Sequence, residues 1–100
     1  MGAEGRTAER HRQAPAQGEG DRRLKQLLEF LAKTLVDNPD QVRVDEFEEE
    51  DETVVYELVV AEEDRGKVIG RGGRTAKALR AIMKAGGTKE GKRVLVEIVD

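Results

Sequence analysis

The stretch GKVIGRGGRT, residues 66–75, limits the possible folds of this chain more than any other segment. It holds four glycines and three basic residues within ten positions, around the apolar pair Val68-Ile69. Glycine has no Cβ, so it adopts backbone conformations and allows close approaches that other residues resist. A bare backbone surrounded by positive charge is typical of loops that hold phosphate groups. We therefore expect a tight, ligand-binding turn at this point.

The segment before the turn begins with the pattern of an amphipathic helix. Five leucines recur at helical spacing, and they are Leu24, Leu27, Leu28, Leu31 and Leu35. Asp21 is the expected N-cap, and Asn38-Pro39 is expected to end the helix because proline disfavours the helical conformation of the residue before it. Phe30 and Val36 widen the apolar face, which we expect to enter the core.

Two strands are predicted next. Alternating residues indicate a strand over 41–47, and a run rich in β-branched residues indicates another over 53–60. The acidic stretch 48–52 is too polar to bury and is expected to form the loop between them. One face of the second strand carries the apolar side chains Val54, Tyr56, Leu58 and Val60.

The glycine-rich turn is expected to join two helices. Residues 61–69 indicate a short helix, and a second helix is predicted to begin after Gly73 and to end at Gly86-Gly87. Its expected inward residues are Ala76, Leu79, Ile82 and Met83, and its basic stripe is Lys77, Arg80 and Lys84. With a final strand over 93–99, the predicted order is α-β-β-α-α-β.

Charge is unevenly distributed along the chain. The net charge of −3 at first argues against a nucleic-acid partner. However, residues 45–64 hold eleven acidic and no basic side chains, whereas residues 65–93 hold ten Lys or Arg and one acid. A ligand responds to the local field rather than to the chain average. We expect the acidic run to be a solvated surface and the basic run to surround a site.

Composition excludes several classes of protein. The chain has no cysteine and one histidine, His11, which has no ligand partner near it, so no disulfide, metal site or cofactor is expected. No apolar run approaches the roughly 20 residues that span a bilayer, and the N-terminus lacks a secretory signal core. We expect a cytoplasmic protein without membrane association. Residues 1–20 are predicted to be a disordered tail and residues 21–100 one domain.

Three known phosphate-binding patterns resemble parts of residues 66–93. Residues 70–75 lack the last glycine of the dinucleotide fingerprint and do not follow a strand. Residues 86–93, GGTKEGKR, match the start of a P-loop but have Arg93 where Ser or Thr would bind Mg²⁺, and a helix precedes them instead of a strand. The remaining pattern, I-G-x-x-G over residues 69–73, is the loop with which KH domains clamp nucleotide backbone. A helix–helix turn without a ligand is the alternative.

The expected RNA-binding residues lie in this loop and its flanks. The glycines admit phosphates to the main chain, the following helix offers unpaired N–H groups, and the basic side chains supply positive charge. Val68 and Ile69 would either lie beside unstacked bases or pack in the core. The full set is Lys67, Val68, Ile69, Gly70, Arg71, Gly72, Gly73, Arg74 and Lys77.

Three stretches, LVDNPDQVRV, GKVIGRGGRTAKALRAI and TKEGKRVLVEIVD, resemble the KhpA family of small bacterial RNA-binding proteins. The resemblance covers about residues 22–100 and implies an α+β fold, the type II KH domain, with a three-stranded sheet covered on one face by helices. It implies binding of single-stranded RNA without enzymatic activity, as an RNA chaperone or post-transcriptional regulator. It links the chain to cell elongation, cell shape and cell wall biogenesis, and implies a larger KhpB-like partner and, in some members, a homodimer. Gly86-Gly87 departs from the alanines expected there and predicts a shorter or frayed helix end.

The sequence leaves two other functional classes open. A protein-interaction module would use the acidic surface at 45–64 or the basic helix stripe, with RNA binding secondary. A nuclease would need carboxylates that hold Mg²⁺ beside the RNA, but the acids at 45–52 are expected in an open loop. The sequence also has no Ser/His/Asp or Cys/His set, so an enzyme is not expected.

Overall fold

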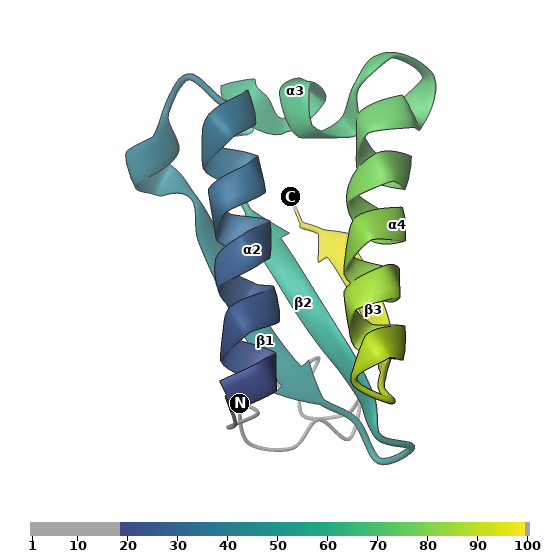
Figure 1. Cartoon of the computed structure of the whole chain (residues 1–100). Helices are drawn as coiled ribbons and strands as arrows, with labels where there is room; N and C mark the ends of the chain where they lie inside the picture. Colours follow the sequence, from purple (N-terminus) through teal and green to yellow (C-terminus); the bar gives the residue numbers. More distant parts are fainter. Residues whose placement is uncertain (1–18, 100) are drawn as a thin grey trace, which may run out of the picture.

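The computed structural model describes residues 19–99, which form a three-stranded sheet with helices on one face (Figure 1). The elements are α2 (Glu19–Leu35), a 3₁₀ turn (Pro39–Gln41), β1 (Arg43–Glu48), β2 (Thr53–Val59), a 3₁₀ turn (Glu62–Asp64), α3 (Arg65–Ile69), a 3₁₀ turn (Arg71–Gly73), α4 (Arg74–Lys89) and β3 (Arg93–Ile98). This order confirms the predicted α+β class and the α-β-β-α-α-β arrangement.

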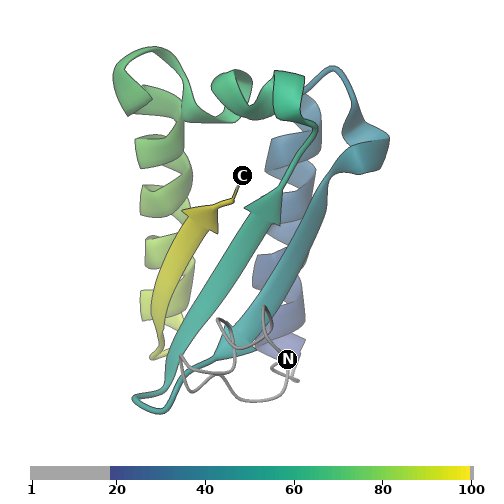
Figure 2. The same ribbon diagram turned by 180° about the vertical axis from the view of Figure 1, so that it is seen from behind.

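The sheet has the order β1-β2-β3, with β1 antiparallel to β2 and β2 parallel to β3. A parallel pair needs a crossover, which α3, the glycine-rich turn and α4 provide. In Figure 1, α2 and α4 lie in front of the sheet and α3 lies at one end; seen from behind in Figure 2, the sheet carries no helix of the described part of the chain. The turn between α3 and α4 is thereby held at one end of the domain.

The core lies between the sheet and the two long helices. Strand residues facing the helices alternate along each strand, and the partners Val54–Val94 and Tyr56–Val96 place them side by side. The buried apolar cluster contains Leu24, Leu28, Ala32, Val44, Val54, Tyr56, Leu58, Val60, Val68, Leu79, Met83, Val94 and Val96. The predicted apolar face of the second strand is therefore confirmed.

Four predicted core side chains of α2 and α4 are instead exposed. Phe30 is 66% exposed and Ile82 is 43% exposed. Phe30 follows Leu28 by two residues, which is about 200° around a helix, so it points away from the buried stripe. Leu27 and Leu35 also remain partly exposed, because a helix that packs on a sheet buries a narrower stripe than the five leucines define.

The predicted end of the last helix was wrong. Gly86 and Gly87 lie inside α4, which continues to Lys89. The stop is formed by Gly91, which has a φ of 75° and donates its N–H to Thr88 O at 2.9 Å, while Lys92 N–H bonds Gly87 O at 2.7 Å. This pair of bonds is a Schellman motif, in which a glycine adopts the left-handed conformation just beyond the helix. The helix end is therefore neither shortened nor frayed at Gly86-Gly87.

Other boundaries moved by small amounts. Helix α2 begins at Glu19, so Asp21 lies within the helix rather than at its N-cap. Gln41 belongs to a 3₁₀ turn, and β1 begins two residues later than predicted. The predicted tail over residues 1–20 lies, for residues 1–18, outside the described residues, and the division into tail and domain stays a prediction.

Candidate functional site

The glycine-rich turn takes up backbone conformations that favour glycine. Gly70 has φ 79° and ψ 168°, and Gly72 and Gly73 have φ values of 64° and 77°. Gly73 N–H donates to Gly70 O at 3.0 Å and closes the turn between α3 and α4. Left-handed values at all three positions agree with the tight turn that the sequence predicted.

The glycines differ in what surrounds them. A Cβ on Gly70 would lie 2.2 Å from Thr75 Oγ1 and 2.8 Å from Thr75 N, so the turn packs against the first residues of α4 there. A Cβ on Gly72 or Gly73 would meet no atom within 4 Å. Gly70 therefore serves the local structure, whereas the space beside Gly72 and Gly73 is open; Gly72 is exposed and Gly73 is half-buried.

Helix α4 begins at the open side of this turn. Its N-cap residue is Gly73, and no side chain caps it with a hydrogen bond. The N–H of Arg74, the first residue of α4, donates to Arg71 O in the preceding 3₁₀ turn, and the helix dipole makes this end of α4 favourable for anions. The turn thus combines open main chain with a positive helix end.

Basic side chains surround this end of α4. Arg71, Arg74 and Lys77 are exposed, and within residues 19–99 none of them has an ion pair. Lys67 differs, because its Nζ lies 3.3 Å from an Asp37 carboxylate oxygen. Farther along α4, Arg80 Nε donates to the Val96 carbonyl on β3 at 3.3 Å. Three of the four predicted basic contacts are therefore without a partner in the described part.

The two apolar candidates are placed differently. Val68 is fully buried in the core cluster, whereas Ile69 is 38% exposed at the end of α3. Val68 therefore anchors α3 to the core beneath the turn, and only Ile69 presents apolar surface beside it.

A buried carboxylate that the sequence analysis missed holds α3 in place. Asp64 is fully buried and accepts the N–H of Asp37 at 3.2 Å, the N–H of Asn38 at 2.9 Å and the Asn38 side-chain amide at 2.9 Å. These bonds join the segment that follows α2 to the start of α3, which leads into the turn. The sequence places Asp64 in the acidic run over 45–64 and within the helix predicted over 61–69, and neither feature indicates a buried structural role.

The pKa of Asp64 follows from this setting. Burial raises the pKa, but the hydrogen bonds from Asn38 and Asp37 and the nearby positive charge of Lys67 outweigh it, so the pKa lies below its ordinary value. A carboxyl whose pKa is lowered on folding stabilises the folded state above its unfolded pKa of about 3.9, and this contribution is lost as the pH falls through the folded pKa.

We expect Asp64→Asn to lower the stability at neutral pH and to flatten its fall on acidification. The variant lowers the stability because the charged acceptor of three hydrogen bonds is lost. It weakens the pH dependence because the amide that replaces the carboxylate is not protonated as the pH falls. Urea unfolding at several pH values from about 6 down to about 3 would measure this difference. Asp40→Asn, which removes an exposed acid of the neighbouring turn, is the matched control. Parallel pH curves for wild type and Asp64→Asn would contradict the prediction.

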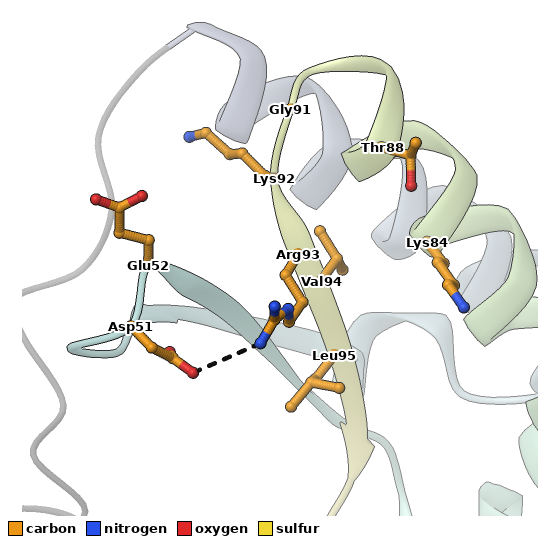
Figure 3. Close-up of a pocket in the computed structure, with 9 residues that line it drawn as sticks. All are labelled: Asp51, Glu52, Lys84, Thr88, Gly91, Lys92, Arg93, Val94 and Leu95. Atoms are coloured by element: carbon orange, nitrogen blue, oxygen red, sulfur yellow. Dashed lines mark ion pairs between the residues drawn. The ribbon is translucent and has the colours of Figure 1, made fainter.

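A surface hollow of ≈ 700 Å³ lies at the other end of α4 (Figure 3). It is lined by Asp51, Glu52, Lys84, Thr88, Gly91, Lys92, Arg93, Val94 and Leu95. Arg93 turns toward Asp51, with 3.8 Å between the guanidinium and the carboxylate, while Lys84 and Thr88 lie on the α4 side of β3. The hollow mixes both charges and contains none of the predicted RNA-binding residues, so it is separate from the turn.

Two further observations concern metal ions and membranes. Over residues 19–99, no group of three or more His, Cys, Asp or Glu side chains could hold a metal ion. None of the helices in that part of the chain combines the length and apolar character that a membrane crossing requires.

The fold and the turn together define a KH domain: an α-β-β-α-α-β unit whose GXXG loop, residues 70–73, joins two helices. Comparison with known proteins agrees. The family model for the KhpA/KhpB KH domain matches residues 25–98, and the chain belongs to this family, as the resemblance implied.

Curated relatives cover most of the chain. An RNA-binding protein KhpA of Clostridium acetobutylicum is 57% identical over 76 residues, which is 76% of this chain and 100% of the relative. The protein of that name from Aquifex aeolicus is 56% identical over 77% of this chain and 96% of its own length. The one from Bacillus subtilis is 44% identical over 80% of this chain and 98% of its own length. All three are named as RNA-binding proteins and not as enzymes, which agrees with the expectation of no enzymatic activity. No solved structure matched the chain.

Proposed function

We propose that this chain is a non-enzymatic RNA-binding protein that clamps the backbone of single-stranded RNA at residues 70–73. The observation that carries the proposal is the open main chain at Gly72 and Gly73 beside exposed Arg71, Arg74 and Lys77. Relatives that share about half of the aligned residues are named for RNA binding, which supports it.

The proposed contact uses phosphates more than bases. Phosphates approach the open glycines and the N-terminus of α4, and the three basic side chains Arg71, Arg74 and Lys77 neutralise the charge of the phosphates. Ile69 offers a small apolar surface beside the path. Base stacking contributes little, because Tyr56 is buried, Phe47 is half-buried in β1, and Phe30 projects from α2, outside the turn. The affinity should therefore fall steeply with salt and depend weakly on base sequence.

The test is fluorescence anisotropy with a pool of short single-stranded RNAs at low and moderate salt. The double variant Arg71→Asp, Gly72→Asp is expected to weaken binding by at least about tenfold, since it removes one positive and adds two negative charges at the phosphate path. Aspartate tolerates the left-handed conformation of Gly72, so the variant should stay folded, which circular dichroism checks. Equal binding by wild type and variant, or no binding by either, would refute the proposed loop function.

The finer role rests on the family resemblance. We propose that the protein acts in the cytoplasm as an RNA chaperone or post-transcriptional regulator linked to cell elongation, cell shape and cell wall biogenesis. A single domain with one clamp binds weakly, so avidity from a larger KhpB-like partner or from a homodimer would strengthen binding. The exposed apolar side chains Leu27, Phe30 and Ile82 of α2 and α4 are candidates for such an interface.

The alternative is a module whose main role is to assemble a protein complex. The same double variant separates the two functions in cells that lack the native protein. If the variant restores function and retains its protein partner while RNA binding is lost, complex assembly is the main role. If function is lost with RNA binding while the partner is retained, the RNA-binding role is supported.

A further inference from the structure

One predicted phosphate contact, Lys67, already has an anionic partner within the chain. Its ammonium group lies 3.3 Å from the Asp37 carboxylate, and the two side chains are 45% and 75% exposed. Arg71, Arg74 and Lys77, by contrast, have no ion pair within the described residues. Lys67 is thus the member of the basic set whose charge is partly neutralised before any ligand arrives.

The Asp37 main chain is fixed in place. Its N–H donates to Asp64 Oδ1 at 3.2 Å, and the next residue, Asn38, bonds the same buried carboxylate twice. Asp64 itself directly precedes α3, the helix that carries Lys67. Because one buried group ties both segments together, the Asp37 carboxylate and the Lys67 ammonium are held within reach of each other.

A carboxylate and an RNA phosphate make the same demand on a lysine. Both are oxygen anions that accept a charge-assisted hydrogen bond from an ammonium group. We infer that Asp37 is an internal competitor of RNA phosphate for Lys67, which weakens RNA binding at the α3 side of the loop. The inference rests on the proposed function. To bind Lys67, an RNA phosphate must displace the Asp37 carboxylate. Otherwise the RNA binds through Arg71, Arg74 and Lys77 alone.

The expected effect is small but has a definite sign. Exposed ion pairs are weak, so removing the Asp37 charge should strengthen RNA binding by about two- to fivefold. A lysine released to neutralise one more phosphate should also make log K fall more steeply with log salt, by about 0.7 for single strands. A variant that merely harmed the fold would weaken binding, so a gain in affinity identifies the competition.

The test compares Asp37→Asn with Asp40→Asn by anisotropy on the same short RNA pool over a series of salt concentrations. Asp40→Asn removes an equal charge from the neighbouring turn and controls for the general field. Asp37→Asn keeps its backbone bond to Asp64, so the turn should stay in place. A third comparison places Asp37→Asn in a Lys67→Ala background, where the gain in affinity should disappear.

The outcomes test the competition of Asp37 for Lys67 separately from the proposed RNA binding. Tighter binding and a steeper salt slope for Asp37→Asn alone, abolished by Lys67→Ala, support the competition. Equal affinity and slope for Asp37→Asn and Asp40→Asn overturn it, as does a gain that persists without Lys67. If wild type itself fails to bind the RNA pool, the proposed function fails, and this result differs from equal RNA binding by Asp37→Asn and Asp40→Asn.

Discussion

Gly70→Ala is expected to lower the free energy of unfolding by about 3 kcal/mol and to weaken RNA binding more than any other single glycine substitution in the loop. Two causes add up. The conformation of Gly70, with φ 79° and ψ 168°, is in a region that is essentially restricted to glycine. The new Cβ would also lie 2.7 Å from Thr75 Cβ and 2.8 Å from Thr75 N.

The second cause cannot be relieved by a side-chain rotation. Thr75 N belongs to the main chain of the first turn of α4, so the helix start itself must move. That movement would carry Arg74 and the N-terminus of α4 away from their present places. Shortening Thr75 removes the contacts with its hydroxyl and leaves the main-chain contact, so Thr75→Ala should not restore the loop.

Gly72→Ala is the matched control for this prediction. Gly72 has a φ of 64° with no atom within 4 Å of its Cβ position, so alanine there costs only about 1 kcal/mol for the left-handed backbone. Urea unfolding followed by circular dichroism gives the stabilities, and RNA anisotropy under conditions where both variants are folded gives the affinities. Equal stabilities of the two variants would show that the contact with Thr75 is not a constraint on the loop.

The sequence predicted the order of elements because the local patterns and the overall fold agree. Leucines at helical spacing, β-branched strands and glycine breaks each specify one element without help from distant residues. The errors arose where packing decides. Phe30 and Ile82 are apolar and near the buried stripes, but their exposure depends on which part of each helix meets the sheet. The end of α4 depended on whether Gly86-Gly87 or Gly91 adopts a left-handed conformation, and composition alone does not distinguish them.

The candidate site divides in the same way. The glycines and the basic side chains of the loop are neighbours in the sequence, so the sequence alone predicts that they lie close together. The contacts that restrain them are not local. Asp64 holds Asp37 and Asn38 across 27 and 26 positions, and Asp37 reaches Lys67 from a different segment. An acidic run viewed as sequence gave no indication that one member is buried and a second acid, outside that run, neutralises a predicted RNA contact.

Alanine substitutions of Gly86 and Gly87, the two glycines within α4, are expected to change the stability by different amounts, because the surroundings of the two positions differ. Alanine is the better helix former by about 1 kcal/mol, so both substitutions would stabilise an isolated helix. At Gly87, however, a Cβ would lie 2.3 Å from Val94 Cγ2 and 3.0 Å from the Lys92 carbonyl oxygen. At Gly86 the nearest atom is Leu24 Cδ2 at 2.5 Å, the far end of a flexible side chain.

We therefore expect Gly87→Ala to lower the free energy of unfolding by about 2 kcal/mol net and Gly86→Ala to change it by less than about 1 kcal/mol. The strand start cannot retreat from Gly87, because Lys92 N–H is bonded to Gly87 O at 2.7 Å. For a domain of this size the urea midpoint of Gly87→Ala should fall by about 1 M or more, while that of Gly86→Ala stays near the wild-type value. If Gly87→Ala is as stable as Gly86→Ala, the close approach of α4 to β3 does not require glycine, and these positions reflect no packing constraint.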